Sequence, residues 1–524
     1  METIETATAV TTRAATAPAP SAAEVKRFLE IWSSGLYAKE DLLNRPQEIF
    51  TAHRLNFDPA LVRTLYESKF LRGKSGKFDT LPPAFDDFRE YIHTKIRWRE
   101  NIRLGAAPSN PVFRAFRERQ IQRCQIELGT EQNTAIVHTP LVFEMTRGCS
   151  VKCWFCALDA PPLTAVYEYT PDNVQFLRDV LSVAKEVVGT GSRWASSYWG
   201  TDPLDNPHQE KFNDEFLDIF GMYPQTTTAI PLRDVERVRT LLKDSHAKGC
   251  YVNRFSVRTA AQLRGIHAAF SAEELLYTEL IMQQLESDSV KARAGRLIHF
   301  AQDLPKLANR DEDKLVAMLH ERDPELAARA TAILINLPGS TGAVVRANGN
   351  GEATEEFNVA INVPGTTSCL TGFKINMVDR TVELLSPCPA TEQWRLGHIV
   401  FEEGRFETAA DLRTLMLGMI ERNMTREVTP EMPVYFSPRM KYFEEDDGFK
   451  LATVFGSVAC RDTTRAPYLK HMGAMIREGT NCAGDVALQC FYLFGMPEIY
   501  TLGNIRNLFN HGMLTEEPRP VLQA

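Results

Sequence analysis

Residues 141–156 read LVFEMTRGCSVKCWFC, an apolar run followed directly by three cysteines. The apolar run belongs to a stretch of strand character from 134 to 146 and predicts a buried β-strand. Cys149, Cys153 and Cys156 follow with three and then two residues between them, so their thiols must lie on one wrapped loop at the end of that strand. Soft thiolates arranged in this way suit an iron–sulfur cluster or zinc, and three of them leave one metal position open.

Zinc is the plain alternative for this loop. A structural zinc site needs a fourth cysteine or histidine at short spacing, and the next one downstream is His208, far beyond Cys156. Three unconnected buried thiols are the other alternative, because free cysteines often serve as small apolar side chains. The spacing favours an iron–sulfur cluster over both.

The composition excludes several classes of protein. The chain has 524 residues and a formal net charge of -8, with 59 Lys and Arg against 67 Asp and Glu. That balance disfavours a nucleic-acid protein, which needs a basic surface for phosphate contacts. No run approaches the ~20 apolar residues of a membrane span, and the N-terminus lacks the order of a secretory signal, so a cytoplasmic protein is expected. Ten cysteines are too few for a disulfide scaffold of this length.

Helical and strand patterns alternate after the cysteine loop. The expected helix and strand pairs are 171–188 with 193–199, 209–219 with 226–230, and 235–247 with 252–257. Repeated units of this kind imply an α/β fold with a parallel sheet, helices on the outside and active loops at the C-terminal ends of the strands. The cysteine loop lies at such an end.

Composition and pattern divide the rest of the chain. The expected order is a disordered tail at 1–22, a helical N-terminal region at 23–133, a core at 134–400 with a charged helical insertion at about 271–332, a linker helix at 401–432, and a small α+β unit at 433–524. Further strands are expected in the core at 332–337, 357–363, 373–378 and 381–385. In the last unit, short strands precede two helices, at 466–477 and 483–491.

The cysteine loop resembles that of the radical S-adenosyl-L-methionine (SAM) superfamily, both in spacing and in its placement after a strand. The resemblance implies a [4Fe-4S] cluster held by Cys149, Cys153 and Cys156, with SAM on the fourth iron and a partial (β/α)6 barrel around both. It also implies an external electron donor such as flavodoxin or ferredoxin. The candidate cofactor contacts are Phe155, Gly200, Thr201, Asp202, Asn253, Ser256 and Arg258.

Different features of the sequence point to these candidate contacts, and each contact has its own alternative. The superfamily usually shows a Gly-Gly-Glu-Pro-like segment that contacts the SAM amino group, and here Thr201 and Asp202 replace its second glycine and its glutamate. A plain turn is the alternative for 200–204. Phe155 corresponds to the aromatic position near the adenine, with core packing as its alternative. Arg258 offers a planar fork that suits a carboxylate, with a surface face as the alternative.

Longer stretches resemble one group within that superfamily, the radical SAM peptide epimerases of ribosomal natural-product pathways, of the proteusin or polytheonamide-maturing type. The resemblance covers about 134–394 and is carried by Arg147–Pro162, Tyr198–Pro207 and Thr371–Pro389. It implies an isomerase that converts L-residues of a precursor peptide to D-residues. A radical removes the α-hydrogen, and a thiol returns a hydrogen atom from the opposite face.

The resemblance places the hydrogen donor outside the cluster loop. Cys369 stands at about the implied position, and Cys388 is the second candidate. Either one would otherwise be an inert buried thiol. An auxiliary cluster is a competing use of these two cysteines and of Cys460, Cys482 and Cys490, which show no tight multi-cysteine pattern.

The C-terminal unit resembles the precursor-recognition domains of such pathways, and is similar to the small peptide chaperone of pyrroloquinoline quinone synthesis. Those domains accept a leader peptide as an added strand at a sheet edge, so a precursor peptide is the implied partner. A helix-turn-helix DNA reader is the alternative for the two helices, and the acidic run from Glu444 to Asp447 counts against it. Neither nucleic acid nor a membrane is an expected partner.

Three other classes stay open on the sequence alone. A different radical SAM peptide modification, such as thioether or carbon–carbon crosslinking, would use the same cluster. A non-catalytic peptide-binding protein would retain the C-terminal unit and bind no iron. A cobalamin-dependent methyltransferase would need a cofactor domain that the helical residues 24–125 do not resemble.

Overall fold

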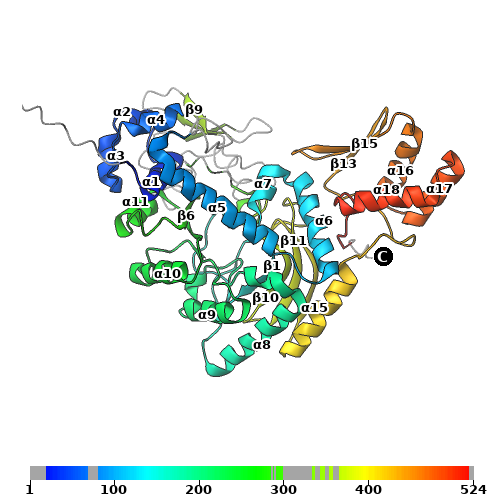
Figure 1. Ribbon diagram of the computed structural model, residues 1–524, viewed down its shortest axis with the longest axis horizontal. Coiled ribbons are helices and arrows are strands. Elements are labelled where there is room, and N and C mark those ends of the chain that lie inside the picture. Colours follow the sequence, from blue (N-terminus) through cyan, green and yellow to red (C-terminus); the bar gives the residue numbers. More distant parts are fainter. Residues whose placement is uncertain are drawn as a thin grey trace, which may run out of the picture.

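The structure is a computed structural model that describes residues 19–68, 81–284, 287, 289, 291–298, 333–336, 343–347, 353–357 and 365–518. It is a mixed α/β protein built from several small sheets with helices around them (Figure 1). The expected α/β class is confirmed at that level. Most of the tail expected at 1–22 lies outside the described residues. No helix in the described part of the chain is long and apolar enough to cross a membrane.

Helices fill the described part of the chain before the first strand, as the apolar spacing there predicts. They are α1 (Ala22–Ser33), α2 (Lys39–Asn44), α3 (Pro46–His53), α4 (Leu61–Glu67), η2 (Pro83–Phe85), α5 (Asp86–Gly105), α6 (Pro111–Glu127) and α7 (Gly129–Ala135). A capping box starts α1, because Ser21 Oγ accepts from Glu24 N and the Glu24 carboxylate accepts from Ser21 N. The rings of Phe50 and Phe57 pack around Phe28 on its buried face.

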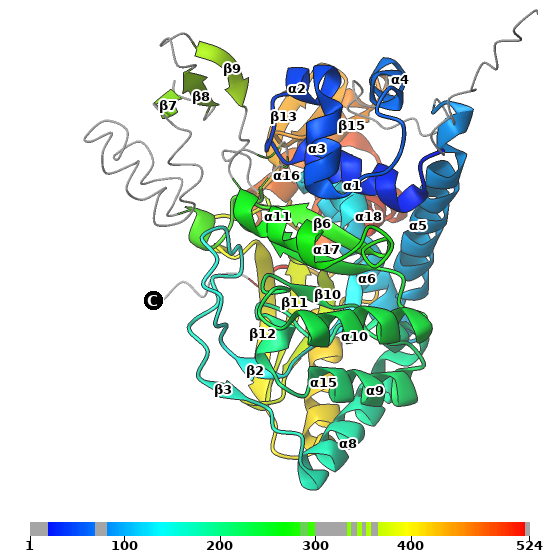
Figure 2. The same ribbon diagram turned by 90° about the vertical axis from the view of Figure 1, so that its left-hand side faces the viewer.

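Strands and helices alternate through the core. In chain order they are β1 (Thr139–Glu144), β2 (Thr146–Arg147), β3 (Ala165–Val166), α8 (Pro171–Val188), η3 (Gly189–Trp194), η4 (Pro203–Asp205), α9 (Gln209–Phe220), β4 (Thr227–Thr228), α10 (Val235–Ala247), β5 (Asn253–Val257), α11 (Ala260–Ala269) and β6 (Thr278–Met282). β5 pairs in parallel with β4 on one side and with β6 on the other. The helices α8 to α11 follow one another along one side of the molecule (Figure 2).

Two elements of this region differ from the expectation. In place of the strand expected at 193–199, the 3₁₀ turn η3 ends at Trp194, and a single parallel bridge joins Ser196 to Val142. The insertion expected at 271–332 contains β6, which extends the pairing of β4 and β5. The charge of Glu279 gives that strand a polar appearance, but its carboxylate is paired inside the protein. The remainder, 299–332, lies outside the described residues.

A second sheet grows from the other side of β1. Its order is β1-β10-β11-β12, with β10 (Leu370–Asn376), β11 (Thr381–Pro387) and β12 (His398–Arg405). β10 runs parallel to β1, and the other pairs are antiparallel. Gly372 has a φ of 153°, and a Cβ there would stand 2.1 Å from Pro140 O, so glycine is needed for β10 to approach β1. The strands expected at 373–378 and 381–385 are thereby confirmed.

The expected linker at 401–432 contains the end of β12 and the helix α15 (Ala409–Asn423), which packs on α8. β12 is not among the expected strands, because charged residues occupy its outward positions. A separate antiparallel sheet holds β7 (Ile333–Asn336), β8 (Ala343–Ala347) and β9 (Ala353–Phe357). The strand expected at 357–363 lies outside the described residues after Phe357.

The C-terminal unit stands at one end of the molecule (Figure 1). Its three-stranded antiparallel sheet has the order β13 (Lys441–Glu445), β14 (Gly448–Ala452) and β15 (Ser457–Arg461). The helices α16 (Ala466–Glu478), α17 (Ala483–Phe494) and α18 (Glu498–Asn510) follow. Phe449, Met472, Val486 and Ile505 belong to the core that these elements enclose. The first two helices are as expected, and α18 is an addition that packs on α6.

A buried ion network fixes this unit to the core. Glu127 of α6 has a fully buried side chain and pairs with Arg123 at 2.5 Å and with Arg439 at 2.8 Å. Arg123 also donates to Ser386 Oγ at 3.1 Å, so the network joins α6, the C-terminal unit and the end of β11. Burial alone would raise the pKa of Glu127, but the two arginines hold it below its usual value.

Glu127→Ala is expected to lower the free energy of unfolding by about 3–5 kcal/mol, because it leaves two buried arginines without their partner. Urea denaturation followed by circular dichroism measures the change. The matched control is Glu402→Ala, which removes the partner of the solvent-accessible Arg422 and should cost less than about 1 kcal/mol. Equal losses in the two variants would contradict the structural role of the network.

Candidate functional site

The three cysteines of the loop line one cavity of about 410 Å³. Cys149, Cys153 and Cys156 are partly buried and free. The loop begins at Gly148, where φ is 79° and a Cβ would stand 2.1 Å from Pro162 O, so the position requires glycine. A parallel bridge between Cys149 and Pro162 then closes the loop on itself.

Charged side chains hold the loop at its start. Asp205 of η4 accepts from Ser150 N at 2.8 Å and from Ser150 Oγ at 2.5 Å. Arg233 pairs with the same carboxylate at 3.1 Å and donates to Ser150 Oγ at 2.9 Å. The side chain of Asp205 is fully buried, so the start of the loop is tied firmly to the segment that follows Gly200.

A second clamp holds the far part of the loop. Arg296 Nη1 donates to Cys153 O at 3.0 Å, and Nη2 donates to Ala160 O at 2.8 Å. The backbone N–H of Arg296 donates to Cys156 O at 2.9 Å. Hydrogen bonds from a charged group are stronger than neutral ones, so this one residue of the segment 291–298 fixes much of the loop.

Burial raises the pKa of the Cys153 thiol to about 12, and it also raises the pKa of the Cys149 thiol. The positive charge of Arg258 opposes the shift at Cys153. Arg258 Nε is buried and meets no hydrogen-bond acceptor among the described residues. A metal must therefore displace thiol protons as it binds. Among the residues that the structure describes, no three His, Cys, Asp or Glu side chains converge closely enough to hold a single metal ion.

The segment 200–202 lines the same cavity. Gly200, Thr201 and Asp202 are all part of the lining, and Gly200 N donates to Glu144 Oε1 at 3.1 Å at the end of β1. The Asp202 carboxylate is bonded within the fold and accepts from Ala229 N at 2.7 Å. Burial raises its pKa to about 6, against the hydrogen bonds it accepts. Its main contribution is to fix the backbone of this segment.

Of the other expected cofactor contacts, Phe155 and Ser256 line the cavity, whereas Asn253 and Arg258 do not. Asn253 is buried, and its Nδ2 donates to Ser245 Oγ at 2.8 Å. Side chains alternate along a strand, so Asn253 and Ser256 lie on opposite faces of β5. This placement gives Asn253 a structural role between α10 and β5 instead of the expected contact.

A second cavity, of about 620 Å³, adjoins the first. Residues from β1, β5, β6 and α5 form its walls, and Cys369 is part of its lining. The residues that line both cavities are Leu158, Tyr198, Trp199, Thr227, Ser256, Ile281 and Thr367. The two cavities are therefore neighbours that share these seven residues as a common boundary.

The two cysteines expected as hydrogen donors lie in different surroundings. Cys369 lines the second cavity, and its carbonyl accepts from Thr139 N at 2.9 Å, at the N-terminal end of β1. The cysteine loop follows the opposite end of the same strand, so Cys369 and the loop stand beside opposite ends of β1. Cys388 is fully buried and lines neither cavity, and burial raises the pKa of its thiol to about 12.

Charged residues that the sequence does not single out line the second cavity. Arg254 of β5 pairs with Glu279 of β6 at 2.8 Å, and Glu279 pairs with Lys95 of α5 at 2.5 Å. Although burial opposes it, these two cations hold the pKa of Glu279 far below its usual value. Arg99 and Arg193 add two further positive charges, so the lining is basic.

Comparison with known proteins identifies a family to which this chain belongs but assigns it no activity. No family model matches the sequence, and no solved structure matches it significantly. The uncharacterized protein y4wI of Sinorhizobium fredii (strain NBRC 101917 / NGR234) is 32% identical over 432 residues, which cover 82% of this chain and 75% of the relative. The name of that protein states no activity. At this identity and coverage, the chain belongs to the same family as y4wI.

Proposed function

We propose that this protein is a cytoplasmic radical SAM peptide epimerase, which converts L-residues of a ribosomally made precursor peptide to D-residues. The observation that carries the proposal is a pair of neighbouring cavities, one lined by the three cysteines of the loop and the other by Cys369. Inversion at a carbon needs two agents on opposite faces, one that removes hydrogen and one that returns it. A crosslinking enzyme needs only the first.

The finer fold in this proposal is a partial (β/α)6 barrel. Residues of β1, β5 and β6, together with Ser196 and Thr227, line a single cavity, and the helices α8 to α11 contribute no residue to its lining. β10 supplies a sixth parallel segment on the other side of β1. Barrels of this kind bind ligands at the C-terminal ends of their strands, where the cysteine loop stands.

The loop suits a [4Fe-4S] cluster held by Cys149, Cys153 and Cys156, with SAM on the open iron. Each cysteine of such a cluster binds a different iron atom, so the three thiols need not converge on one point. The unpartnered Nε of Arg258 favours the negative charge of thiolates and cluster. When bound, cluster and SAM supply a carbon radical that removes a hydrogen atom, with the electron from a donor such as flavodoxin or ferredoxin.

The lining of the first cavity limits which residues are able to contact SAM. Phe155 and Ser256 line the cavity beside the backbone of 200–202. The Asp202 carboxylate is occupied by Ala229 N, so it orients that backbone and makes no direct contact in this proposal. Backbone carbonyls and amides of 200–202 then bind the polar groups of the cofactor.

The second cavity suits the peptide. Its lining combines aromatic rings, which cover an extended chain, with the cations Lys95, Arg99, Arg193 and Arg254, which bind carbonyl or carboxylate oxygens. β1 has six residues, so its two ends lie roughly 17 Å apart at about 3.3 Å per residue. Cys369 faces the peptide from the end opposite the cysteine loop. Its thiol gives a hydrogen atom to the α-carbon from that side and so completes the inversion.

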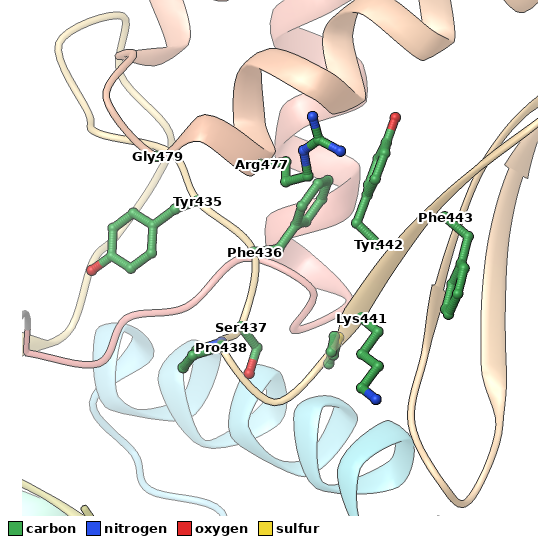
Figure 3. A pocket seen from close by; sticks show the side chains of 10 residues that line it. Tyr435, Phe436, Ser437, Pro438, Lys441, Tyr442, Phe443, Arg477 and Gly479 are labelled. Carbon is green, nitrogen blue, oxygen red and sulfur yellow. The ribbon is translucent and has the colours of Figure 1, made fainter.

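The C-terminal unit offers a groove for a leader peptide. A cavity of about 640 Å³ opens beside β13, lined by Phe436, Tyr442 and Phe443 and by the cations Lys441 and Arg477 (Figure 3). Among the described strands β13 is an edge, so its outer backbone groups are able to pair with an added strand. The lining holds two cations and no acidic side chain, so an acidic leader complements it best.

A variant with Cys149→Ala, Cys153→Ala and Cys156→Ala is expected to bind no iron after anaerobic reconstitution with ferrous ion and sulfide. The wild-type protein should bind about four iron atoms and, with dithionite, cleave SAM to methionine and 5′-deoxyadenosine. Iron analysis and liquid chromatography measure both properties. Cys460→Ala, in β15, is the matched control and should behave as wild type. The proposal would be contradicted by wild-type protein that binds no iron and leaves SAM intact.

Cys369→Ala is expected to cleave SAM and remove the α-hydrogen but to form no D-residues, because no thiol then returns the hydrogen atom. Chiral amino-acid analysis of a precursor from the same gene neighbourhood, co-expressed in deuterated water, measures inversion and the one deuterium gained at each site. Cys388→Ala is the control and should invert the same residues. The reverse pattern would assign the donor to Cys388. Loss of two hydrogens per modification would identify crosslinking.

Arg477→Glu is expected to weaken binding of the leader segment of that precursor at least tenfold, roughly 1.4 kcal/mol, because it reverses the charge of the groove. Fluorescence anisotropy with the labelled leader measures the dissociation constant. Arg506→Glu, on an exposed position of α18, is the matched control and should bind as wild type. Equal weakening in both variants would show a general charge effect in place of a groove.

A further inference from the structure

The proposed inversion leaves Cys369 without the hydrogen atom that it needs for the next turnover. Our inference about how that hydrogen is restored rests on the proposed function. When the Cys369 thiol gives its hydrogen atom to the peptide, its sulfur becomes a thiyl radical. The next turnover requires one electron and one proton at that sulfur. Cys369 is partly buried and lines the cavity in which the proposal places the peptide, so a bound peptide would stand between its sulfur and reductants in solution.

A short backbone link places Trp194 near Cys369. The carbonyl of Cys369 accepts from Thr139 N at 2.9 Å, and Thr139 Oγ1 donates to Trp194 O at 2.6 Å. Cys369 and Trp194 also line the same cavity. Thr139 thus holds the backbones of these two residues close together at the wall of one cavity.

Oxidisable rings continue from Trp194 to the surface. The ring centroids of Trp194 and Trp98 are 5.5 Å apart, and those of Trp98 and Tyr251 are 5.0 Å apart, both in edge-to-face contact. Tyr251 is 40% exposed. Gly105 of α5 leaves the space for this arrangement, because a Cβ there would stand 2.3 Å from Trp194 Nε1. Contact is thus unbroken from the cavity wall to solvent.

The composition of this row differs from that of the core. Edge-to-face pairs between buried rings of the main core join phenylalanines, as in Phe113 with Phe373 and Phe143 with Phe216. Tryptophan and tyrosine also pair elsewhere, as in Trp32 with Tyr66. The row from the cavity to the surface uses only tryptophan and tyrosine, the two side chains whose rings give up an electron most readily.

We propose that Tyr251, Trp98 and Trp194 form an electron relay that returns Cys369 to its thiol state after each inversion. One electron passes inward from ring to ring and reduces the thiyl sulfur, which takes a proton from water in the cavity. The oxidised Tyr251 loses its phenolic proton to solvent. A one-electron reductant at the surface, such as the reduced flavodoxin or dithionite that the reaction already uses, restores it with an electron and a proton.

The relay predicts that loss of one of its rings slows the later turnovers and leaves the rate of the first turnover unchanged. Tyr251→Phe, at a position outside the cavity lining, should form the first D-residue per enzyme at the wild-type rate with saturating precursor, and then slow at least tenfold. Tyr251→Trp, which keeps an oxidisable ring, should keep the later turnovers. Trp32→Phe, in the N-terminal helices, is the control and should turn over as wild type. Rapid quench with chiral analysis measures both phases.

A second measurement needs neither cluster nor SAM. In the iron-free protein, azide radicals made by pulse radiolysis oxidise tryptophan, and transient absorbance follows transfer of the oxidation to tyrosine. The amplitude of this transfer should fall in Trp98→Phe and in Tyr251→Phe, and remain in Trp394→Phe, which removes a tryptophan elsewhere in the core. Transfer that is unchanged in all three variants overturns the relay, because the rings would then not be coupled.

The two experiments separate the two proposals. Wild-type protein that forms no D-residues overturns the epimerase, while the radiolysis still decides whether the rings are coupled. Wild-type protein that inverts residues, together with a Tyr251→Phe variant that turns over normally, overturns the relay alone. Cys250 also lines the second cavity. If Cys250→Ala stalls after one turnover and Tyr251→Phe does not, a second thiol carries the electron and the relay is wrong.

Discussion

The wrapped loop at 148–162 depends on hydrogen bonds from charged side chains that lie outside it. Its backbone is left-handed at Lys152, with φ of 54°, and at Asp159, with φ of 46°. Such conformations cost non-glycine residues about 1–3 kcal/mol each. The bond that the Asp205 carboxylate accepts from Ser150 N and the bond that Arg296 donates to Cys153 O offset that cost, because charge strengthens both. Both anchors come from distant parts of the chain, so the loop takes its shape only when the core closes around it.

The strand β1 sets the geometry of everything that the loop faces. The cysteine loop follows its C-terminal end, and the pairing with β10 places Cys369 beside its N-terminal end. The backbone of Cys369 and the start of the cysteine loop are therefore separated by the length of one strand, and the sheet fixes that spacing. Gly372 enforces this register, because any larger residue there would collide with Pro140.

The sequence predicts those elements whose stability depends on residues close together in the chain. The helices at 171–188 and 235–247 are predicted to the residue, because their apolar spacing coincides with the caps of Thr170 and Asp234. The cysteine loop is found for the same reason. Arg296 and the pair of Arg254 with Glu279 are missed because their partners are distant in sequence, and only the folded chain brings them together. Arg254 alone left a signal, since it stands two residues before Ser256 on one strand face.

The helical N-terminal region is part of the second cavity, although the sequence pattern sets it apart. Lys95, Trp98, Arg99 and Ile102 all lie on one face of α5 and close the space that β1, β5 and β6 leave open. The C-terminal unit contributes no residue to this lining. Selection of the residue to be inverted therefore falls in this proposal to α5 and the strands, and the C-terminal unit acts on the leader alone. The two forms of recognition are separable because no described wall is common to both.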